Sequence, residues 1–363
     1  MEAKSTPSSP NVRRLRLFTI LTVFLLLGVS IVSGEILVRI LGAHQTWTEK
    51  NGGSYVSPYR QEFPRAWILD RGPNRILSYG QPEFDYEIRI NLEGVRDVDH
   101  PVDKPAGEYR IVVLGDSWVE GQGASFEKTW PKILEENLNR HGFDRHIVVI
   151  MGGVAGSDPV FELELFRKRL QKYNPDMVIQ AVNDSDITDM ISRGGLDRFT
   201  ADGMVKDRKA PTFEPLWARC RLFRVIMMDL LHYDWLLLSR NQQQAKTDEA
   251  LDTIVEVAGA MSALAEAKGF NYFVIGHPQR NHFLYRGEYK IQPLESLLRG
   301  IGVDFVDIRP LVGAEFGADP SRIWDYFWKL DGHANEKGYE LFARAVERKI
   351  TPKLQAELAA TAN

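Results

Sequence analysis

The stretch 110–121, RIVVLGDSWVEG, joins a short apolar run to a turn that carries Ser117. Residues 110–115 are predicted to form a buried β-strand, because a short apolar run bounded by a turn signal is typical of a strand in a parallel sheet. Ser117 then lies just beyond the carboxyl end of that strand. Ligands of open parallel sheets bind at this edge, so the position of Ser117 predicts a functional site.

From residue 110 onward, apolar runs typical of buried strands alternate with amphipathic stretches typical of helices. Strands that are separated by crossover helices form a parallel sheet covered on both faces. The sequence therefore predicts a three-layer α/β/α domain with a five-stranded parallel sheet. The further strands are predicted at 146–151, 177–182, 270–275 and 303–306, and the helices at 128–140, 159–173, 248–268 and 335–350.

The composition is that of a globular protein. The chain has 363 residues, of which 44% are hydrophobic and 26% charged, both near the globular average. Lysine plus arginine number 45 against 49 aspartates and glutamates, so no basic excess indicates a nucleic-acid partner. The single cysteine, Cys220, excludes an intramolecular disulfide and a cysteine-rich metal site. We expect no metal or organic cofactor.

Residues 17–33, LFTILTVFLLLGVSIVS, form an uncharged apolar segment near the N-terminus. A helix of this length spans roughly 25 Å, enough for a thin bilayer. Arg13, Arg14 and Arg16 precede it, and this positive flank predicts a cytoplasmic N-terminus, with the rest of the chain periplasmic or extracellular. A cleaved signal peptide and a buried core helix are the alternatives. The anchor is favoured because the segment exceeds a usual signal h-region and no Ala-x-Ala site follows it.

The rest of the chain divides around the predicted anchor and the predicted α/β domain. Residues 34–109 are rich in aromatic and turn residues, and the alternation of Tyr86, Ile88 and Ile90 indicates a small β element on a stalk. An insertion at 198–246 is apolar almost all round, which favours a lid over the core and leaves a membrane contact as the alternative. The predicted segments are a cytoplasmic N-terminus (1–16), a transmembrane anchor (17–33), the stalk region (34–109), the main domain (110–350) and a C-terminal tail (351–363).

Residues able to catalyse acyl transfer follow several of the predicted strands. Ser117 needs a base to take its proton, and His333 is the leading candidate because the pKa of histidine is naturally close to neutral. Asp331 is close enough in sequence to orient that imidazole. The backbone amides of Ser117 and Gly153 and the side-chain amide of Asn183 are placed to bind an oxyanion.

Other polar residues near this edge have simpler interpretations. His277, after the fourth strand, is interpreted as a loop histidine near the substrate rather than as the base. Asp116 is expected to hydrogen-bond the turn that contains Ser117. Asp325 is the alternative to Asp331 as the acid.

The order and spacing of these residues resemble the SGNH, or GDSL, hydrolase superfamily of the membrane-anchored bacterial type. The resemblance implies a flavodoxin-like three-layer domain, with Ser117 as nucleophile, His333 as base, and oxyanion donors at Ser117, Gly153 and Asn183. It covers roughly 110–348 in separated blocks: Gly115-Asp116-Ser117 with Gly121, Gly153 in Gly-Gly-Val-Ala-Gly, Asn183 with Asp184, and Asp331-Gly332-His333 followed by Gly338.

The chain departs from the family pattern in two places. The acid stands two residues before His333 where many members have three, but the shorter spacing is known among members that act on acylated polysaccharides, so Asp331 is kept. Met151 replaces a polar residue that is common in the second block. The stretch 91–96, NLEGVR, also resembles the membrane-anchored members.

These features together predict a serine ester hydrolase that acts on an acylated carbohydrate or glycan through an acyl-enzyme. An O-acetyltransferase of polysaccharide modification is an alternative, because it would use the same residues and pass the acyl group to a sugar hydroxyl instead of water. A lipid esterase would suit the apolar insertion and the anchor. A non-catalytic glycan-binding subunit is the alternative from another class, and the complete set of Ser117, Asn183 and His333 argues against it. The expected partners are the acylated substrate and the membrane, and the sequence indicates no oligomeric state.

Overall fold

The computed structural model describes residues 10–50, 52–55, 74–200, 206, 210–234, 236–284, 289–317 and 319–361. The chain divides into two compact units, one formed by Met1–Arg60 with Lys209–Gln243 and the other by Gln61–Arg208 with Gln244–Asn363. Parts of the predicted segments lie outside the described residues: 1–9 of the N-terminus, 56–73 of the stalk, 201–205 and 207–209 of the insertion, and 362–363 of the tail.

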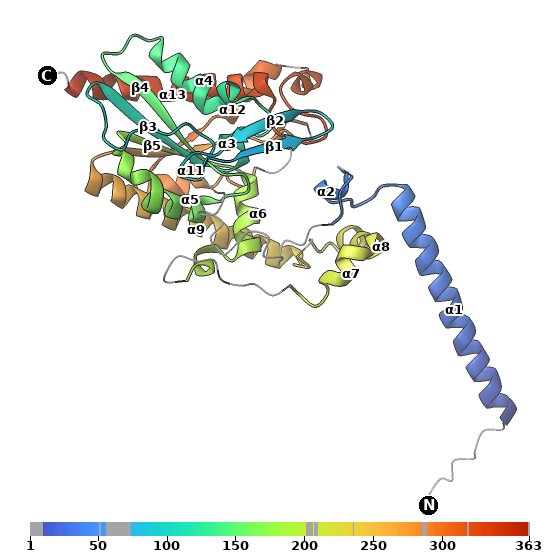
Figure 1. Ribbon diagram of the computed structural model, residues 1–363. Helices are drawn as coiled ribbons and strands as arrows, with labels where there is room; N and C mark the ends of the chain where they lie inside the picture. Colours follow the sequence, from blue (N-terminus) through green and yellow to red (C-terminus); the bar gives the residue numbers. More distant parts are fainter. Residues whose placement is uncertain are drawn as a thin grey trace, which may run out of the picture. The chain divides into compact units, whose positions relative to one another are not determined.

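The larger unit is built on a five-stranded sheet in the order β4-β3-β5-β6-β7, in which all neighbouring strands are parallel (Figure 1). Parallel strands covered on both faces bury nearly every residue, which explains their almost continuous apolar sequences. The predicted five-stranded parallel sheet is therefore confirmed. The strands are β3 (Glu108–Gly115), β4 (His146–Gly153), β5 (Met177–Val182), β6 (Asn271–Gly276) and β7 (Asp304–Asp307).

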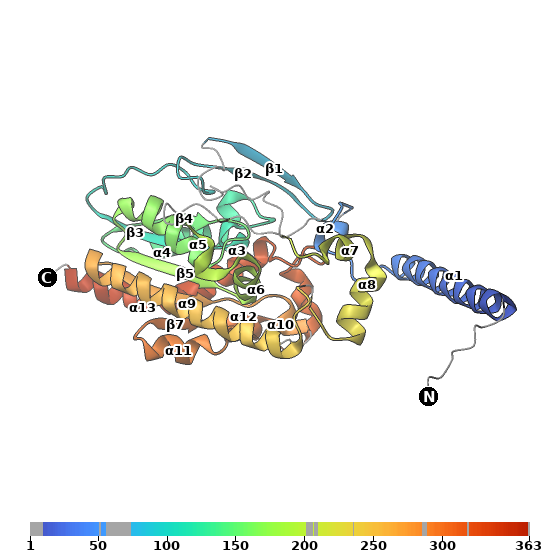
Figure 2. The ribbon, with the colours of Figure 1, turned by 90° about the horizontal axis from the view of Figure 1, so that it is seen from below.

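Helices cover both faces of this sheet and give the predicted three layers (Figures 1 and 2). Successive side chains of a strand point to opposite faces. Along β3, Ile111 and Val113 belong to one core, and Val112 and Leu114 to the other. The first core is covered by α4 (Trp130–Asn139), α12 (Arg309–Phe316) and α13 (Glu336–Thr361), and the second by α5 (Pro159–Leu165), α9 (Arg240–Lys268) and α11 (Leu294–Gly300).

Two helices are longer than the sequence pattern predicts. Helix α9 begins at Arg240 rather than at residue 248, and α13 continues to Thr361 rather than ending near residue 350. Helix α13 runs through Pro352, which lacks a backbone N–H, and Leu354 beyond it is fully buried in the core. Burying a leucine side chain stabilises by roughly 1.5–3 kcal/mol, which offsets much of the cost of the proline.

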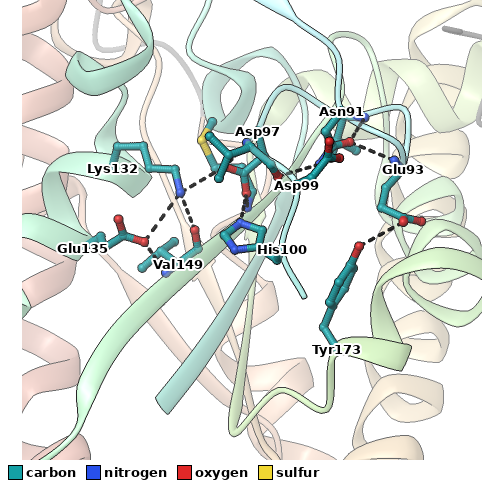
Figure 3. A network of polar contacts seen from close by, with 12 residues as sticks. Asn91, Glu93, Asp97, Asp99, His100, Lys132, Glu135, Val149 and Tyr173 are labelled. Carbon is teal, nitrogen blue, oxygen red and sulfur yellow. Dashed lines mark hydrogen bonds and ion pairs between the residues drawn. The ribbon is translucent and has the colours of Figure 1, made fainter. Parts of the chain in front are cut away.

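Strand β4 lies at one edge of the sheet, and side chains occupy its outer hydrogen-bonding groups (Figure 3). The Val149 amide donates to Glu135 Oε2 at 2.6 Å, and the Val149 carbonyl accepts from Lys132 Nζ at 2.6 Å. The next outer amide, of Met151, donates to Asp97 Oδ2 at 2.8 Å. An open edge offers such groups to another strand, and here they are already bonded.

An antiparallel hairpin precedes the sheet in sequence, as the alternation predicts. It consists of β1 (Ile76–Gly80) and β2 (Asp85–Arg89). In the turn that follows, Asn91 Oδ1 accepts from the Glu93 amide at 3.0 Å, and Tyr173 OH donates to Glu93 Oε1 at 2.9 Å (Figure 3). The first bond shapes the turn, and the second ties the 91–96 segment to Tyr173 within the larger unit.

The smaller unit combines the N-terminal helix with the described part of the insertion. Helix α1 (Pro10–Ile40) contains the one candidate membrane span in the described ranges, Asn11–Ile40, and none of its most apolar window is buried. Glu35 accepts hydrogen bonds from the amides of Arg221 and Leu222, at the start of α8 (Arg221–Val225). The insertion thus packs on the C-terminal end of α1, and its role as a lid stays a prediction. The unit also holds α2 (Trp47–Lys50) and α7 (Glu214–Arg219).

Candidate active site

Ser117 begins a short helix, α3 (Ser117–Glu120), directly after the carboxyl end of β3. Asp116 caps this helix, because its Oδ1 accepts from the Trp118 amide at 2.9 Å. Gly115 is needed for the close approach of strand and helix, since a Cβ there would lie 2.3 Å from the Val119 side chain. The Gly-Asp-Ser sequence therefore produces a tight turn that presents Ser117 at the sheet edge.

The structure brings Ser117, His333 and Asp331 together as predicted. Ser117 Oγ lies 2.7 Å from His333 Nε2, and His333 Nδ1 lies 2.6 Å from Asp331 Oδ1. Gly332 between the two has φ of +95°, a conformation that favours glycine. This conformation allows an acid only two residues before the histidine to reach its ring.

The surroundings of Asp331 keep its carboxylate charged. Burial alone would raise the pKa of Asp331, but hydrogen bonds from the ring and amide of His333 and the charge of that ring hold the pKa below its ordinary value. The Trp118 ring packs beside His333, with centroids 4.9 Å apart. An ionised acid can orient the imidazole and stabilise its protonated form.

A small hollow of about 270 Å³ opens beside Ser117 and His333. Its walls come from the segments after β3, β4, β5 and β6 and from the loop that carries Asp331 and His333. Apart from Trp118 and two glycines, its lining is polar or charged. The lining residues are Asp116, Ser117, Trp118, Gly156, Ser185, Asp189, Gln279, Arg280, Asn281, Asp331, Gly332 and His333.

The other two predicted oxyanion donors, Asn183 and Gly153, lie next to the turn that carries Ser117. Asn183 is fully buried, and its Nδ2 donates to Asp116 Oδ2 at 3.0 Å. Its Oδ1 accepts from the Ser185 amide and caps α6 (Asp184–Arg193). Gly153 packs directly on the backbone of α3. Within the described ranges neither Asn183 nor Gly153 lines the hollow, and their oxyanion roles stay predictions.

Sequence comparisons give short matches. No family model matches the chain. An arylesterase from Vibrio mimicus is 32% identical over 77 residues, which is 21% of this chain and 38% of the arylesterase. The chain resembles the SGNH/GDSL ester hydrolases. A mannonate dehydratase from Marinomonas sp. (strain MWYL1) is 27% identical over 99 residues, 27% of this chain and 24% of the dehydratase. The chain therefore spans well under half the length of these curated relatives.

Solved structures of esterases are also similar to this SGNH-like chain. A two-domain esterase active on acetylated mannans is 15% identical, with a TM-score of 0.40, and the match covers 68% of this chain and 50% of that one. An acetyl xylan esterase is 14% identical, with a TM-score of 0.42 and coverage of 66% and 99%. The arylesterase match and the assembled Ser117, His333 and Asp331 support an ester-bond hydrolase.

One interpretation from the sequence needs correction, and the alternative acid is not the one bonded to His333. His277 stands in the loop after β6, as expected, but its side chain is buried, because it is only 2% exposed and its ring packs on the Trp118 ring with centroids 5.1 Å apart. Burial lowers the pKa of His277 to about 4, so it stays neutral at physiological pH. Asp325 is exposed, and His333 Nδ1 is bonded to Asp331 instead. Asp325 is therefore not the triad acid in this structure.

Side chains for which the sequence patterns gave no signal also contact the loop of Asp331 and His333, among them Gln122 and Arg280. Gln122 Nε2 donates to Asp331 Oδ2 at 2.9 Å. Arg280 Nη1 donates to the carbonyls of Trp328 and Lys329. In the part of the chain that the structure describes, no group of three or more histidine, cysteine or acidic residues is placed to hold a metal ion.

Proposed function

We propose that this chain is a serine ester hydrolase that removes a short acyl group from an acylated carbohydrate through an acyl-enzyme at Ser117. The observation that carries the proposal is the 2.7 Å contact between Ser117 Oγ and His333 Nε2, with Asp331 bonded to the far side of the ring. A nucleophile, a base and an orienting acid in contact beside an open hollow are the parts that acyl transfer requires.

In the proposed reaction, His333 Nε2 takes the proton of Ser117 as Oγ attacks the ester carbonyl carbon. The resulting imidazolium then gives this proton to the leaving alcohol, and the acyl group remains on Ser117. Water gives a proton to His333 Nε2 as it attacks the acyl carbon. The imidazolium then returns this proton to Ser117 Oγ as the acyl C–O bond breaks, which releases the carboxylic acid and free Ser117. Asp331 stays ionised throughout and stabilises the imidazolium.

The negative charge that develops on the carbonyl oxygen needs donors. We assign this role to the backbone amides of Ser117 and Gly153 and to the Asn183 side chain. A preorganised donor acts mainly on the rate of the chemical step, because the charge it binds is present only in the transition state.

The size and lining of the hollow support the choice of substrate. A volume of about 270 Å³ is below the usual range of roughly 300–1,000 Å³ for ligand pockets, which suits a short acyl group such as acetyl. Ser185, Gln279 and Asn281 offer hydrogen bonds to sugar hydroxyls, whereas a long lipid chain needs an apolar channel. The polar lining therefore favours an acylated carbohydrate over a lipid ester.

Helix α1 is proposed as a single-pass anchor that leaves the hydrolase unit in the periplasm or outside the cell. Its apolar side chains are exposed along the candidate span, and Arg13, Arg14 and Arg16 form the positive flank expected on the cytoplasmic side. A reporter that is active only in an oxidising compartment, fused after Asn363, should therefore be active. Activity of a cytosol-only reporter at the same place would contradict this topology.

The deciding experiment is labelling of the full-length chain with a fluorophosphonate probe, combined with hydrolysis of esters of increasing acyl length. We expect Ser117→Ala and His333→Ala to abolish labelling and hydrolysis, and Ser296→Ala, at an exposed position of α11, to change neither. Acetyl esters should be hydrolysed faster than long-chain esters. A chain that does not label, or that still labels as Ser117→Ala, would refute the proposed nucleophile.

A further inference from the structure

Gln122 connects the two ends of the proposed triad. Its Nε2 donates to Asp331 Oδ2 at 2.9 Å, whereas Asp331 Oδ1 accepts from the ring and the backbone amide of His333. The Gln122 backbone amide donates to the Ser117 carbonyl at 3.0 Å. Contacts therefore run from Ser117 through His333, Asp331 and Gln122 back to Ser117, in a closed ring.

The backbone of Gln122 is itself held from two sides. Tyr339 OH, buried in α13, donates to the Gln122 carbonyl at 3.0 Å. Arg96, 1% exposed, donates to the carbonyls of Glu120, Gly121 and Ala124 at 2.8–2.9 Å. A buried guanidinium with several carbonyl partners has little freedom to move, so the turn that carries Gln122 is fixed relative to α3.

A neutral amide suits this place beside Asp331. As a donor, it favours the ionised form of the carboxylate, which the imidazolium of His333 needs as a partner. It also leaves only one oxygen of Asp331, Oδ1, directed at the ring. Because Gln122 gains and loses no proton, it can hold Asp331 in place through every step of the reaction.

We propose that Gln122 is a positioning residue for the triad, which sets the orientation and charge of Asp331 and through them the basicity of His333. The inference rests on the proposed function, since it requires that His333 is the base for Ser117. It assigns to the residue after Gly121 a role that none of the sequence blocks indicates.

The test measures the rate of fluorophosphonate labelling of Ser117 against pH in the full-length chain. In Gln122→Glu, a second carboxylate would face Asp331 Oδ2, and this added negative charge would favour the protonated, cationic form of the nearby His333 ring. We expect the acid limb of the rate profile to move to higher pH by about one unit or more. Gln122→Ala should lower the labelling rate on the plateau of the pH profile by roughly 10–100-fold. Losing the hydrogen-bond partner that orients a metal-binding histidine has an effect of this size in metal sites.

Gln292→Glu is the matched control, because it makes the same chemical change at an exposed position of the same unit. It should leave the profile unchanged, and the thermal midpoints of all variants should show that they are folded. If the wild-type chain labels but the acid limb of the rate profile does not move in folded Gln122→Glu, the positioning role alone is overturned. Wild-type chain that does not label at any pH would refute the proposed function itself.

Discussion

Asn183 Nδ2 donates a hydrogen bond to Asp116 Oδ2, so the proposed oxyanion donor is tied to the carboxylate next to the proposed nucleophile. Asn183 follows β5 and Asp116 follows β3, and these two strands are neighbours in the sheet. The same Asn183 side chain caps α6 through its Oδ1. The helix-capping role of Asn183 and its proposed role in catalysis can be separated by substitution.

Asn183→Ala should lower kcat by roughly 10²–10³ with KM changed only a few-fold, because a lost oxyanion donor acts on the transition state. It should also cost about 1 kcal/mol of stability through the lost cap. Asn183→Ser keeps a capping oxygen but loses the amide and its bond to Asp116, so it should show the loss in kcat with a smaller loss of stability than Asn183→Ala. Steady-state kinetics and thermal unfolding measure both effects. Full kcat in Asn183→Ala would leave Asn183 as a helix cap only.

Gly153→Ala should be damaging, although φ of this glycine is not positive. A Cβ at this position would lie 2.3 Å from Glu120 N and 2.6 Å from the Val119 carbonyl carbon, and these are backbone atoms of α3. Overpacking of this kind costs about 1–3 kcal/mol and would displace the helix that begins with Ser117. Gly300→Ala, where the added Cβ meets open space, should be nearly neutral. Equal unfolding midpoints for the two variants would contradict this reading of the packing.

Glu83→Ala should loosen the loop that carries Asp331. The Glu83 carboxylate accepts from the backbone amides of Lys329, Leu330 and Asp331 at 2.7–3.0 Å. Loss of hydrogen bonds to a charged group costs about 1.5–3 kcal/mol, so we expect faster hydrogen exchange at these three amides and a lower kcat. Glu87→Ala, an exposed glutamate on the same hairpin, is the control. Unchanged exchange in Glu83→Ala would show that the loop holds its shape without the hairpin.

Glu162→Gln should flatten the pH dependence of stability. Burial, together with the negative charges of Asp116 and Asp158, raises the pKa of Glu162 to about 8. Folding then takes up a proton between the ordinary pKa of 4.5 and about 8, so the free energy of unfolding falls as pH rises through that window.

The slope for a single such group is about 1.4 kcal/mol per pH unit. Glutamine resembles the protonated acid and can still contact Ser157 and Gln180. The variant should therefore be more stable than wild type at pH 8 and similar to it near pH 5, as measured by thermal unfolding. Glu164→Gln, a partly exposed neighbour in α5, should show no such difference. A pH-independent gap between Glu162→Gln and wild type would rule out a neutral Glu162.

The strands and the order of the site residues could be predicted because their signals are local. The run 177–182 is apolar except for Gln180 and is buried at every position, and β5 has the predicted bounds. Ser117 and Asn183 could be predicted because they stand just after β3 and β5. His333 lies well beyond β7, and its signal was the Asp331-Gly332-His333 sequence. Asp331 was predicted as the acid, but the sequence does not show how it reaches the ring from only two residues before His333. The structure explains this through the positive φ of Gly332.

The contacts that could not be predicted join distant parts of the chain. Gln122 and Asp331 are 209 residues apart, and nothing about a glutamine between two glycines indicates a carboxylate partner. The burial of His277 was missed because a histidine after a strand has the same sequence pattern whether it faces solvent or the core. The start of α9 was missed because residues 240–247 are mostly polar and show no apolar period.

The occupied edge of β4 has a consequence for how copies of this protein meet one another. A strand from a second molecule could add to the sheet there only by displacing the side chains of Glu135, Lys132 and Asp97 from the β4 backbone. Two of these side chains would lose a charged partner at the same time, since Lys132 also pairs with Asp97 at 3.0 Å. Growth of the sheet from one molecule to the next is thereby disfavoured on this side, and the folded unit resists aggregation through β4 even where its local concentration is high.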